Sequence, residues 1–541
     1  MNEGRARDPG TRNPAEHGFM AFWRSRQQMG AAALIMGVSI FLSRFMGLIR
    51  DKLISYLFGA TRESDVYFAA FVIPDFINYL LAGAYFSITL IPLLAAAFER
   101  DREDGWRFFS TVLTWIALVI SLVTAVAMLF APQLARLAAP GLPPEALERL
   151  AYFLRIVLPA QVCFLLGSCF TAILYLQKQF FVPALVPLVY NFFIIAGGIL
   201  MRSRGMEGFC WGVLAGAFAG NLFLPWLAAR RTGGMKLRPA LVHPGMKPFL
   251  RMALPLMIGQ SIVVLDEQLV RIFGSLAGIG AISWLNYARR IMLVPVGVVA
   301  QAAGVASYPF LAELHAKDEL PRFCATLNTA LQNTMTLLVP LTAWMMIVAE
   351  PTIRLIFQQG HFTAQDTVHT ARLLQIMLAV VFCWGYQQIL GRAFYATRDT
   401  LTPALLGTLT TLVSIPVFYF LTESLGATGV AVASAAGIFL YSAVLSWSWR
   451  RRFGSATFTG LLPGLLKLAA LSLAAAVPAF ILGRLDIFRS LEHPYLSAFC
   501  LIGASGLCFG AVFLGLAGRL IPALVQPYLK HAGPLARLLL R

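Results

Sequence analysis

The sequence predicts an all-α polytopic membrane protein with fourteen transmembrane helices, arranged as two six-helix lobes related by pseudo-two-fold symmetry plus two C-terminal helices. Of its 541 residues, 58% are hydrophobic and only 13% are charged, and the mean hydropathy is +0.73. A soluble domain could not bury this much apolar surface. Long apolar runs and a weak internal repeat supply the helix number and the lobes.

Fourteen apolar runs of about 20 residues or more are separated by charged or turn-rich connections, as transmembrane helices require. We expect these helices to begin near Gly30, Asp65, Phe108, Ala151, Phe181, Phe209, Pro248, Ala281, Cys324, Ala371, Leu401, Gly426, Leu462 and Ser497. An even number of helices places both chain termini on one side of the membrane.

Short stretches of the first half recur in order in the second half. Asp51–Gly59 resembles Asp266–Gly274, and Tyr175–Leu185 resembles Tyr395–Leu405, at offsets of 215 and 220 residues. Two bundles of six helices repeated in this way have the same orientation, an architecture of alternating-access transporters. The expected organisation is a cytoplasmic basic segment (1–29), an N-lobe (30–230), a cytoplasmic linker (231–247), a C-lobe (248–450), a basic loop (451–461), two helices outside the repeat (462–520) and a cytoplasmic tail (521–541).

Basic residues predict that both termini are cytoplasmic. The runs Arg230–Arg231, Lys236–Lys247 and Arg450–Arg452 all fall on the inner side in that orientation, as the positive-inside rule requires. Topology and contact with anionic lipids thus explain much of the net charge of +18, and we expect no nucleic-acid partner. The seven cysteines lie in or beside apolar runs without a Cys-x-x-Cys pair, which indicates buried apolar residues and not disulfides or metal ligands.

Arginines inside apolar runs are the strongest functional signal. Arg44 lies within the first run, and Arg289 and Arg290 lie adjacent in the run that begins near Ala281. An arginine near the centre of a membrane helix costs roughly 2.5–3.5 kcal/mol, so it usually faces a partner or a wet cavity. We favour Arg44 and Arg290 as parts of a cationic cavity between the lobes, because guanidinium groups bind phosphate oxygens in pairs.

Two simpler interpretations of these arginines stay open. Arg44 could snorkel towards the headgroups near Arg50 and Asp51. The arginines could also form structural ion pairs, and the acidic candidates are Asp51, Asp65, Asp75 and Asp266. A kink at Pro74 would bring Asp75 and Asn78 to the same cavity.

Enzyme signatures are scarce in the sequence. It contains neither a Gly-x-x-x-x-Gly-Lys phosphate loop nor His-Glu-x-x-His, and no histidine lies deep in an apolar run. Without a nucleotide site, movement would be driven by an ion gradient, the membrane potential or the substrate gradient. The sequence therefore predicts a secondary transporter without a cofactor.

A set of motifs between Gly37 and Arg452 resembles one family in combination. These motifs are Ser43-Arg44-x-x-Gly47-x-x-Arg50-Asp51, Phe58-Gly59-Ala60 with Asp65, Ser283-Trp284-Leu285 with Tyr287-Ala288-x-Arg290, Pro295-x-Gly297, Phe362-Thr363-x-x-Asp366, and Phe394-Tyr395-Ala396 with Asp399 and Thr402-Pro403. The chain is similar to the MurJ/MviN lipid II flippase family of the multidrug/oligosaccharidyl-lipid/polysaccharide exporter superfamily.

The resemblance implies transfer of the undecaprenyl-pyrophosphate-linked peptidoglycan precursor, lipid II, from the cytoplasmic to the periplasmic leaflet of the bacterial inner membrane for cell-wall synthesis. It implies that Arg44, Arg50 and Arg290 contact pyrophosphate, and the substrate-binding candidates also include Asp51, Asp65, Asn78 and Arg289. The last two helices would hold the polyprenyl tail. Asp266 and Asp399 are candidates for a coupling cation, Na⁺ or H⁺. Expected partners are membrane lipids and cell-wall synthesis proteins, with the chain as a monomer.

The chain departs from the family pattern at a few positions. Asn78-Tyr79 and Ala82-Gly83-Ala84 stand where the family commonly has a basic pair followed by Ala-Glu-Gly, and Arg289 and Leu293 stand where acids are expected. A flippase for another polyprenyl-linked oligosaccharide, of the O-antigen or exopolysaccharide type, is therefore an alternative. A non-transporting membrane scaffold is another, and it predicts that Arg44 and Arg290 can be neutralised without effect.

Overall fold

The computed structural model describes residues 29–82, 89–231, 235–261, 265–485 and 493–522. Within these ranges every regular element is a helix, which confirms the predicted all-α class. The predicted basic segment up to residue 28, the departures at Gly83 and Ala84, and the tail from residue 523 lie outside the described residues.

The first half of the chain forms α2 (Met29–Phe58), α3 (Arg62–Ala69), α4 (Val72–Ala82), α5 (Ile91–Arg100), α6 (Arg102–Leu129), α7 (Ala131–Ala138), α8 (Pro144–Val157), α9 (Ala160–Leu176), α10 (Phe181–Leu200), the 3₁₀ turn η2 (Arg202–Arg204), α11 (Glu207–Gly216), the π-helical turn η3 (Ala217–Phe223) and α12 (Leu224–Arg231). We call α2 to α12 the N-lobe.

The second half forms α13 (Met246–Ser261), α14 (Leu265–Leu276), α15 (Ala281–Pro295), the π-helical turn η4 (Val296–Ala300), α16 (Gln301–Ala316), α17 (Leu320–Ile347), α18 (Ala349–Phe357), α19 (Ala364–Leu378), α20 (Val381–Ala396), α21 (Leu401–Leu425), α22 (Ala427–Phe453), the 3₁₀ turn η5 (Ala456–Phe458), α23 (Leu461–Gly483) and α25 (Pro494–Leu520). We call α14 to α22 the C-lobe.

Ten helical spans of the described residues are long and apolar enough to cross a membrane, or eleven if α19 and α20, which meet at 42°, form one bent span. The number fourteen stays a prediction. The first helix, α2, has 30 residues but carries Arg44 and the run Arg50–Lys52, and the helices on either side of residues 83–88 and 262–264 are interrupted by positions outside the described ranges.

Predicted helix starts differ from observed ones where charged residues continue a helix. The predicted starts at Phe181, Ala281 and Leu401 coincide with the first residues of α10, α15 and α21, but α6 begins at Arg102, before the predicted Phe108. Asp101 caps this longer α6, accepting hydrogen bonds from the next helical N–H groups at 3.1 and 3.2 Å. Hydropathy marks where a helix enters the membrane and not where its backbone hydrogen bonds begin.

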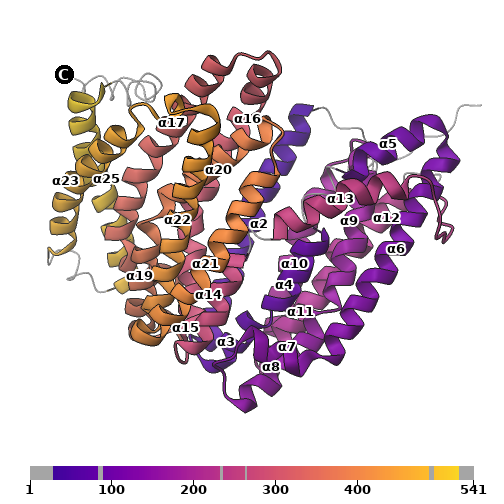
Figure 1. The fold of residues 1–541 in the computed structure, drawn as a ribbon. Coiled ribbons are helices and arrows are strands. Elements are labelled where there is room, and N and C mark those ends of the chain that lie inside the picture. The colour runs from indigo at the N-terminus through magenta and orange to yellow at the C-terminus, as the bar shows by residue number, and fades with distance from the viewer. Residues whose placement is uncertain (1–28, 83–88, 232–234, 262–264, 486–492, 523–541) are drawn as a thin grey trace, which may run out of the picture.

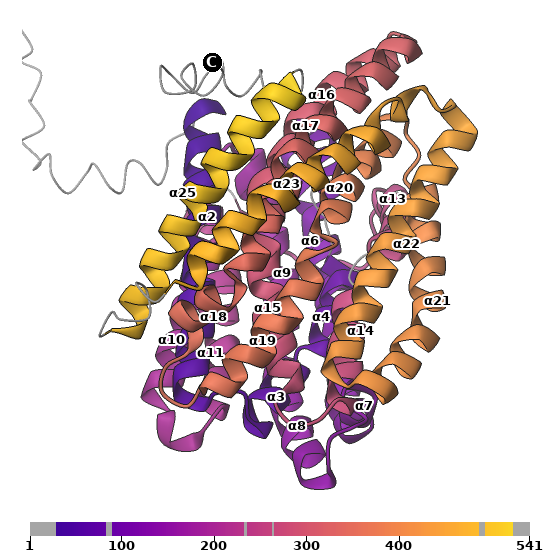
Figure 2. The same ribbon diagram turned by 90° about the vertical axis from the view of Figure 1, so that its left-hand side faces the viewer.

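The two lobes meet at one end and diverge towards the other (Figure 1). Helices α3, α8 and α15 lie together at the joined end, whereas α5 of the N-lobe and the turn between α16 and α17 of the C-lobe lie far apart at the opposite end. The basic end of α22, Arg450–Arg452, lies at this divergent end too (Figure 2). The C-terminal pair α23 and α25 packs against α17 on the outer side of the C-lobe through a separate apolar cluster that includes Val339, Ala475 and Phe513.

Helix α13 belongs to the N-lobe by its packing, although the predicted C-lobe begins at residue 248. Phe249 and Ala253 are buried in one cluster with Phe108 and Phe109 of α6. The connection before α13 follows α6 as well, because the indole N–H of Trp115 donates to the Leu241 carbonyl at 2.9 Å. The chain thus crosses between lobes after α13, a division that hydropathy could not place because both halves of this run are equally apolar.

Candidate functional site

The centre of the site is a buried carboxylate that joins the lobes. Asp51 of α2 is fully buried, and one of its oxygens accepts from Nε and Nη2 of Arg50 at 3.0 and 2.9 Å. Its other oxygen accepts from Nε of Arg290 on α15 at 2.6 Å. A buried carboxylate needs such compensation. Two arginines share this single carboxylate, so the group keeps a net positive charge where the lobes meet.

Arg44 lies about two turns before Asp51 on α2. It contacts the C-lobe through an uncharged side chain and not through a carboxylate. Its Nη2 donates to the side-chain oxygen of Gln301 at 2.8 Å, and its side chain is exposed. The guanidinium lies so close to the backbone of Gly297 that a Cβ there would be 1.7 Å from Nη1. Pro295, which cannot donate a backbone hydrogen bond, immediately precedes η4 in this stretch. The predicted lobe-interface position of Arg44 fits this contact, and Arg44 forms no ion pair with Asp51 or with another acid of the described residues.

The predicted substrate-binding Asp65 is fully engaged by the other lobe. It is 1% exposed, and its oxygens accept from the backbone N–H groups of Gly280 and Ser283 at 2.6 and 2.8 Å and from the Ser283 hydroxyl at 2.7 Å. An N-lobe carboxylate therefore caps the N-terminus of the C-lobe helix α15. Direct substrate contact by Asp65 stays a prediction, since in this conformation its oxygens close the joined end.

Backbone contacts seal the same end. The Gly141 N–H donates to the Ser275 hydroxyl at 3.1 Å, and the His361 N–H donates to the Tyr56 carbonyl at 3.0 Å. Each bond joins an N-lobe residue to a C-lobe residue. This layer of contacts closes the joined end, whereas the lobes diverge towards the opposite end (Figure 1).

A second ion-paired bridge lies near α4. Arg271 of α14 donates to Asp75 at 2.8 Å and to Glu267, one helical turn earlier, at 2.6 Å. Sequence reasoning named Asp75 but missed Arg271. The signal for it was present, because Glu267 and Arg271 have the i, i+4 spacing of a helical ion pair. Asn78, the other predicted residue on α4, does not join this bridge and instead donates to Gln161 of the N-lobe at 3.0 Å.

The residues proposed to hold a cation lie apart and face arginines. Asp266 accepts from Nη1 of Arg289 at 2.7 Å and from the Ser434 hydroxyl at 2.9 Å. Asp399 caps the start of α21 through Thr402, with bonds of 2.9 and 2.7 Å, and pairs with Arg452. No group of three or more His, Cys, Asp or Glu side chains among the described residues could hold a metal ion.

These surroundings fit a bound metal cation poorly. The guanidinium of Arg289 is 8% exposed and already supplies the positive charge that Asp266 needs. Arg289 was predicted to bind substrate, but in this conformation it turns into the C-lobe while its neighbour Arg290 turns towards Asp51. Their different directions follow from the roughly 100° between consecutive helical residues.

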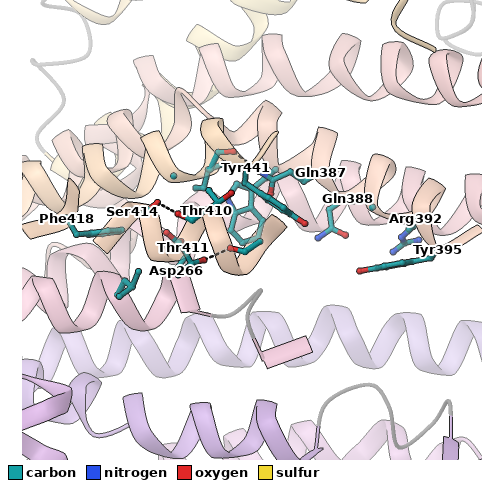
Figure 3. A pocket seen from close by; sticks show the side chains of 16 residues that line it. Asp266, Gln387, Gln388, Arg392, Tyr395, Thr410, Thr411, Ser414, Phe418 and Tyr441 are labelled. Atoms are coloured by element: carbon teal, nitrogen blue, oxygen red, sulfur yellow. Dashed lines mark hydrogen bonds between the residues drawn. The ribbon is translucent and has the colours of Figure 1, made fainter. Parts of the chain in front are cut away.

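A polar cavity of about 340 Å³ lies in the C-lobe beside Asp266, between α14, α20, α21 and α22 (Figure 3). Sequence reasoning did not find it. Its lining includes Gln388, Arg392 and Tyr395, which extend from α20 in Figure 3. The sequence signal for this cavity was the regular spacing of polar residues along α20. Averaged hydropathy obscures this spacing, because the residues between them are apolar.

Comparison with known proteins identifies the family. The family model described as lipid II flippase MurJ matches residues 54–497. A probable lipid II flippase MurJ of Rhizobium meliloti (strain 1021) is 28% identical over 452 residues, which cover 81% of this chain and 83% of that protein. The lipid II flippase MurJ of Burkholderia cenocepacia is 28% identical over 430 residues, covering 76% of this chain and 82% of that protein.

Solved structures share the fold. A lipid II flippase MurJ in an inward closed conformation matches with a TM-score of 0.74 at 23% identity, over 89% of this chain and 98% of that chain. An inward-facing multidrug resistance transporter of the MATE family matches with a TM-score of 0.65 at 16% identity, over 79% and 99%. Since the family model covers most of the sequence and the described helices are those of a multi-pass membrane protein, the chain belongs to the lipid II flippase MurJ family, whose membership indicates the bacterial inner membrane.

Proposed function

We propose that this protein is a flippase that moves lipid II from the inner to the outer leaflet of the cytoplasmic membrane by alternating access. The observation that carries the proposal is the shared Asp51 carboxylate, which holds Arg50 and Arg290 together from opposite lobes. Two guanidinium groups against one buried carboxylate retain donors for a pyrophosphate, which accepts paired hydrogen bonds. The family membership supports a transporter and not an enzyme.

The conformation corresponds to a state open to the cytoplasm. The joined end is sealed by Asp65 on α15, and the divergent end carries the basic run Arg450–Arg452. Basic residues favour the cytoplasmic side, so we assign the divergent end and both chain termini to the cytoplasm. The substrate pyrophosphate would enter from this side and reach Arg290. Rocking of the lobes would then break the contacts of Asp65 and release the head group outside.

We infer a driving force from the charges at the site. An arginine cluster moves with its lobes, so the membrane potential can act on the transition, at about 2.3 kcal/mol per elementary charge per 100 mV. We propose the membrane potential as the primary source of energy and no resident cofactor. The neutralisation of Asp266 by Arg289 argues against a required Na⁺ at that carboxylate.

We place the polyprenyl tail along α23 and α25. This pair lies outside the two lobes and exposes large apolar side chains, among them Leu473, Val477 and Phe499, as a lipid-contacting surface would. We expect the protein to act as a monomer in contact with membrane lipids and with cell-wall synthesis proteins.

The test is complementation of a bacterial host depleted of its resident lipid II flippase. The wild-type chain should restore growth, whereas Arg44→Ala and Arg290→Ala should fail at matched membrane levels. Arg322→Ala is the control, because Arg322 is a 77% exposed arginine paired only with Glu319 outside the site. Failure of a well-expressed wild-type chain would reject lipid II and favour another polyprenyl-linked oligosaccharide, to which the departures at Asn78 and Arg289 point. Growth with both neutralised variants would show that transport does not need these arginines and would reject the proposed pyrophosphate site.

A further inference from the structure

One face of α20 presents a row of side chains whose hydrogen-bonding groups the described residues do not use, although the Arg289 guanidinium lies over the Trp384 ring. Trp384, Gln388, Arg392 and Tyr395 all line the C-lobe cavity and follow one another at intervals of four, four and three residues, which keeps them on one helical face. The indole N–H of Trp384 is buried without an acceptor. Gln388, Arg392 and Tyr395 make no side-chain hydrogen bond to any other residue that the structure describes. The row extends over about 16 Å at 1.5 Å per residue.

Other polar side chains that line the cavity donate their hydrogen bonds within the protein. Thr410, Thr411 and Ser414 of α21 each donate to the carbonyl one turn earlier on their own helix, at 2.8 Å. Gln387 of α20 donates to the Ile438 carbonyl at 2.7 Å, and the Tyr441 hydroxyl donates to the Pro403 carbonyl at 3.1 Å. The donors that a ligand could use therefore lie on α20 alone.

Arg392 is held in place without a counter-ion. It forms no ion pair with an acid of the described residues, and its guanidinium lies against the backbone of Gly304, where a Cβ would be 3.0 Å from both Cζ and Nε. A buried or half-buried cation without a carboxylate is normally balanced by an anionic ligand or by water. Gly304 lies one turn beyond Gln301, the residue that Arg44 contacts, so Arg44 and Arg392 contact neighbouring turns on one face of α16.

We propose that the α20 row, Trp384 to Tyr395, is a subsite for the saccharide and peptide part of the transported lipid, with Arg392 binding a carboxylate. This rests on the proposed function and extends it, because the pyrophosphate is bound elsewhere, at Arg50 and Arg290. A head group of sugar rings and peptide carries many hydroxyl and carbonyl acceptors along its length, and an elongated row of donors matches that pattern. Aromatic groups at both ends of the row suit the apolar faces of sugar rings.

The test separates the two subsites by their ligands. Full-length protein in lipid nanodiscs is titrated with lipid II and, separately, with undecaprenyl pyrophosphate, which lacks the saccharide and peptide, and the dissociation constants are taken from ligand-induced thermal stabilisation. Arg392→Gln should weaken lipid II binding at least about tenfold, the loss of one charge-assisted hydrogen bond, and leave undecaprenyl pyrophosphate binding within about twofold. Arg290→Gln should weaken both ligands.

Two further variants keep the comparison interpretable. Tyr395→Phe preserves shape and removes only the hydroxyl, so lipid II binding should weaken about two- to tenfold. Arg322→Gln makes the same charge change as Arg392→Gln outside the cavity and should leave both dissociation constants unchanged. The ligand-free melting temperature of each variant measures its folding.

Each remaining outcome rejects a specific statement. Wild-type protein that binds neither ligand would reject the proposed function. Lipid II binding unchanged in Arg392→Gln and Tyr395→Phe would reject the subsite and leave the function standing. Equal weakening of both ligands by Arg392→Gln would assign Arg392 to the pyrophosphate. Competition by vesicle-derived phosphatidylglycerol as strong as that by lipid II would identify the row as a general anionic-lipid site and overturn the proposal.

Discussion

Substitution of Asp65 by asparagine should shift the protein away from the observed conformation, which we propose to be open to the cytoplasm. In that state Asp65 accepts three hydrogen bonds from Gly280 and Ser283 across the lobe boundary. Asparagine keeps one acceptor oxygen but places an N–H₂ group against a backbone N–H donor. Hydrogen bonds to charged groups contribute about 1.5–3 kcal/mol each, so losing one of them costs roughly 1.5–3 kcal/mol. If the bond exists in only one of the two conformations, the equilibrium between them shifts about 13- to 160-fold.

The assay is a distance measurement by double electron–electron resonance in nanodiscs. Spin labels at Glu103 and Lys317 report on the divergent end, because both residues are exposed and lie on different lobes. Wild-type protein should give the long distances of a cytoplasm-open state, and Asp65→Asn should add a population with shorter distances as that end closes.

The matched control is Asp366→Asn. Asp366 is also a buried capping carboxylate with three bonds, from the N–H and hydroxyl of Thr363 at 2.8 Å each and from the Trp284 indole at 2.9 Å, but all of its partners lie in the C-lobe. It should lower thermal stability without changing the distances. If folded Asp65→Asn gave the same distance distribution as wild type, the interpretation of Asp65 as a latch between the lobes would be wrong.

Two further predictions concern the arginines of α15. Arg290→Gln leaves fully buried Asp51 with Arg50 as its arginine partner, which should lower the free energy of unfolding by about 1.5–3 kcal/mol in denaturant titrations, the loss of one hydrogen bond to a charged group. Arg290→Lys should restore stability better than transport, because lysine lacks the paired donors. A stability of Arg290→Gln equal to wild type would exclude a compensating role for this pair. The melting temperature of the wild type should be the same in NaCl and in choline chloride at equal ionic strength. Arg289→Gln removes the partner of Asp266 and should lower the melting temperature, and Na⁺ but not choline should raise it again. A Na⁺-dependent wild type would contradict the view that Arg289 replaces a cation.

Local sequence patterns were sufficient for the parts of the fold that depend on neighbouring residues. Composition and apolar runs predicted the all-α membrane class, and the observed starts of α10, α15 and α21 match because each follows directly from the change between polar and apolar residues. The cost of placing Arg44 and Arg290 in apolar runs pointed to the lobe interface, where both contact the opposite lobe.

Local patterns could not predict which carboxylate pairs with which arginine. Four carboxylates were candidate partners of the arginines, and sequence spacing could not rank them. The observed pairs join residues far apart in the chain: Arg290 and Asp51 are 239 positions apart, and Arg271 and Asp75 are 196 positions apart. Asp65 has no arginine at all and caps α15 instead. Which carboxylate meets which donor depends on how the lobes dock.

The sequence by itself determined that the chain is helical, crosses the membrane many times and carries arginines in an apolar environment, since hydropathy and the energy of burying charge act on each residue within its own helix. Only the tertiary structure decided that α13 packs with the N-lobe, that Arg289 turns to Asp266 while Arg290 turns to Asp51, and that a row of unused donors on α20 faces a cavity. These features depend on contacts between helices that are distant in the chain. The energy of such contacts cannot be read from the pattern of neighbouring residues.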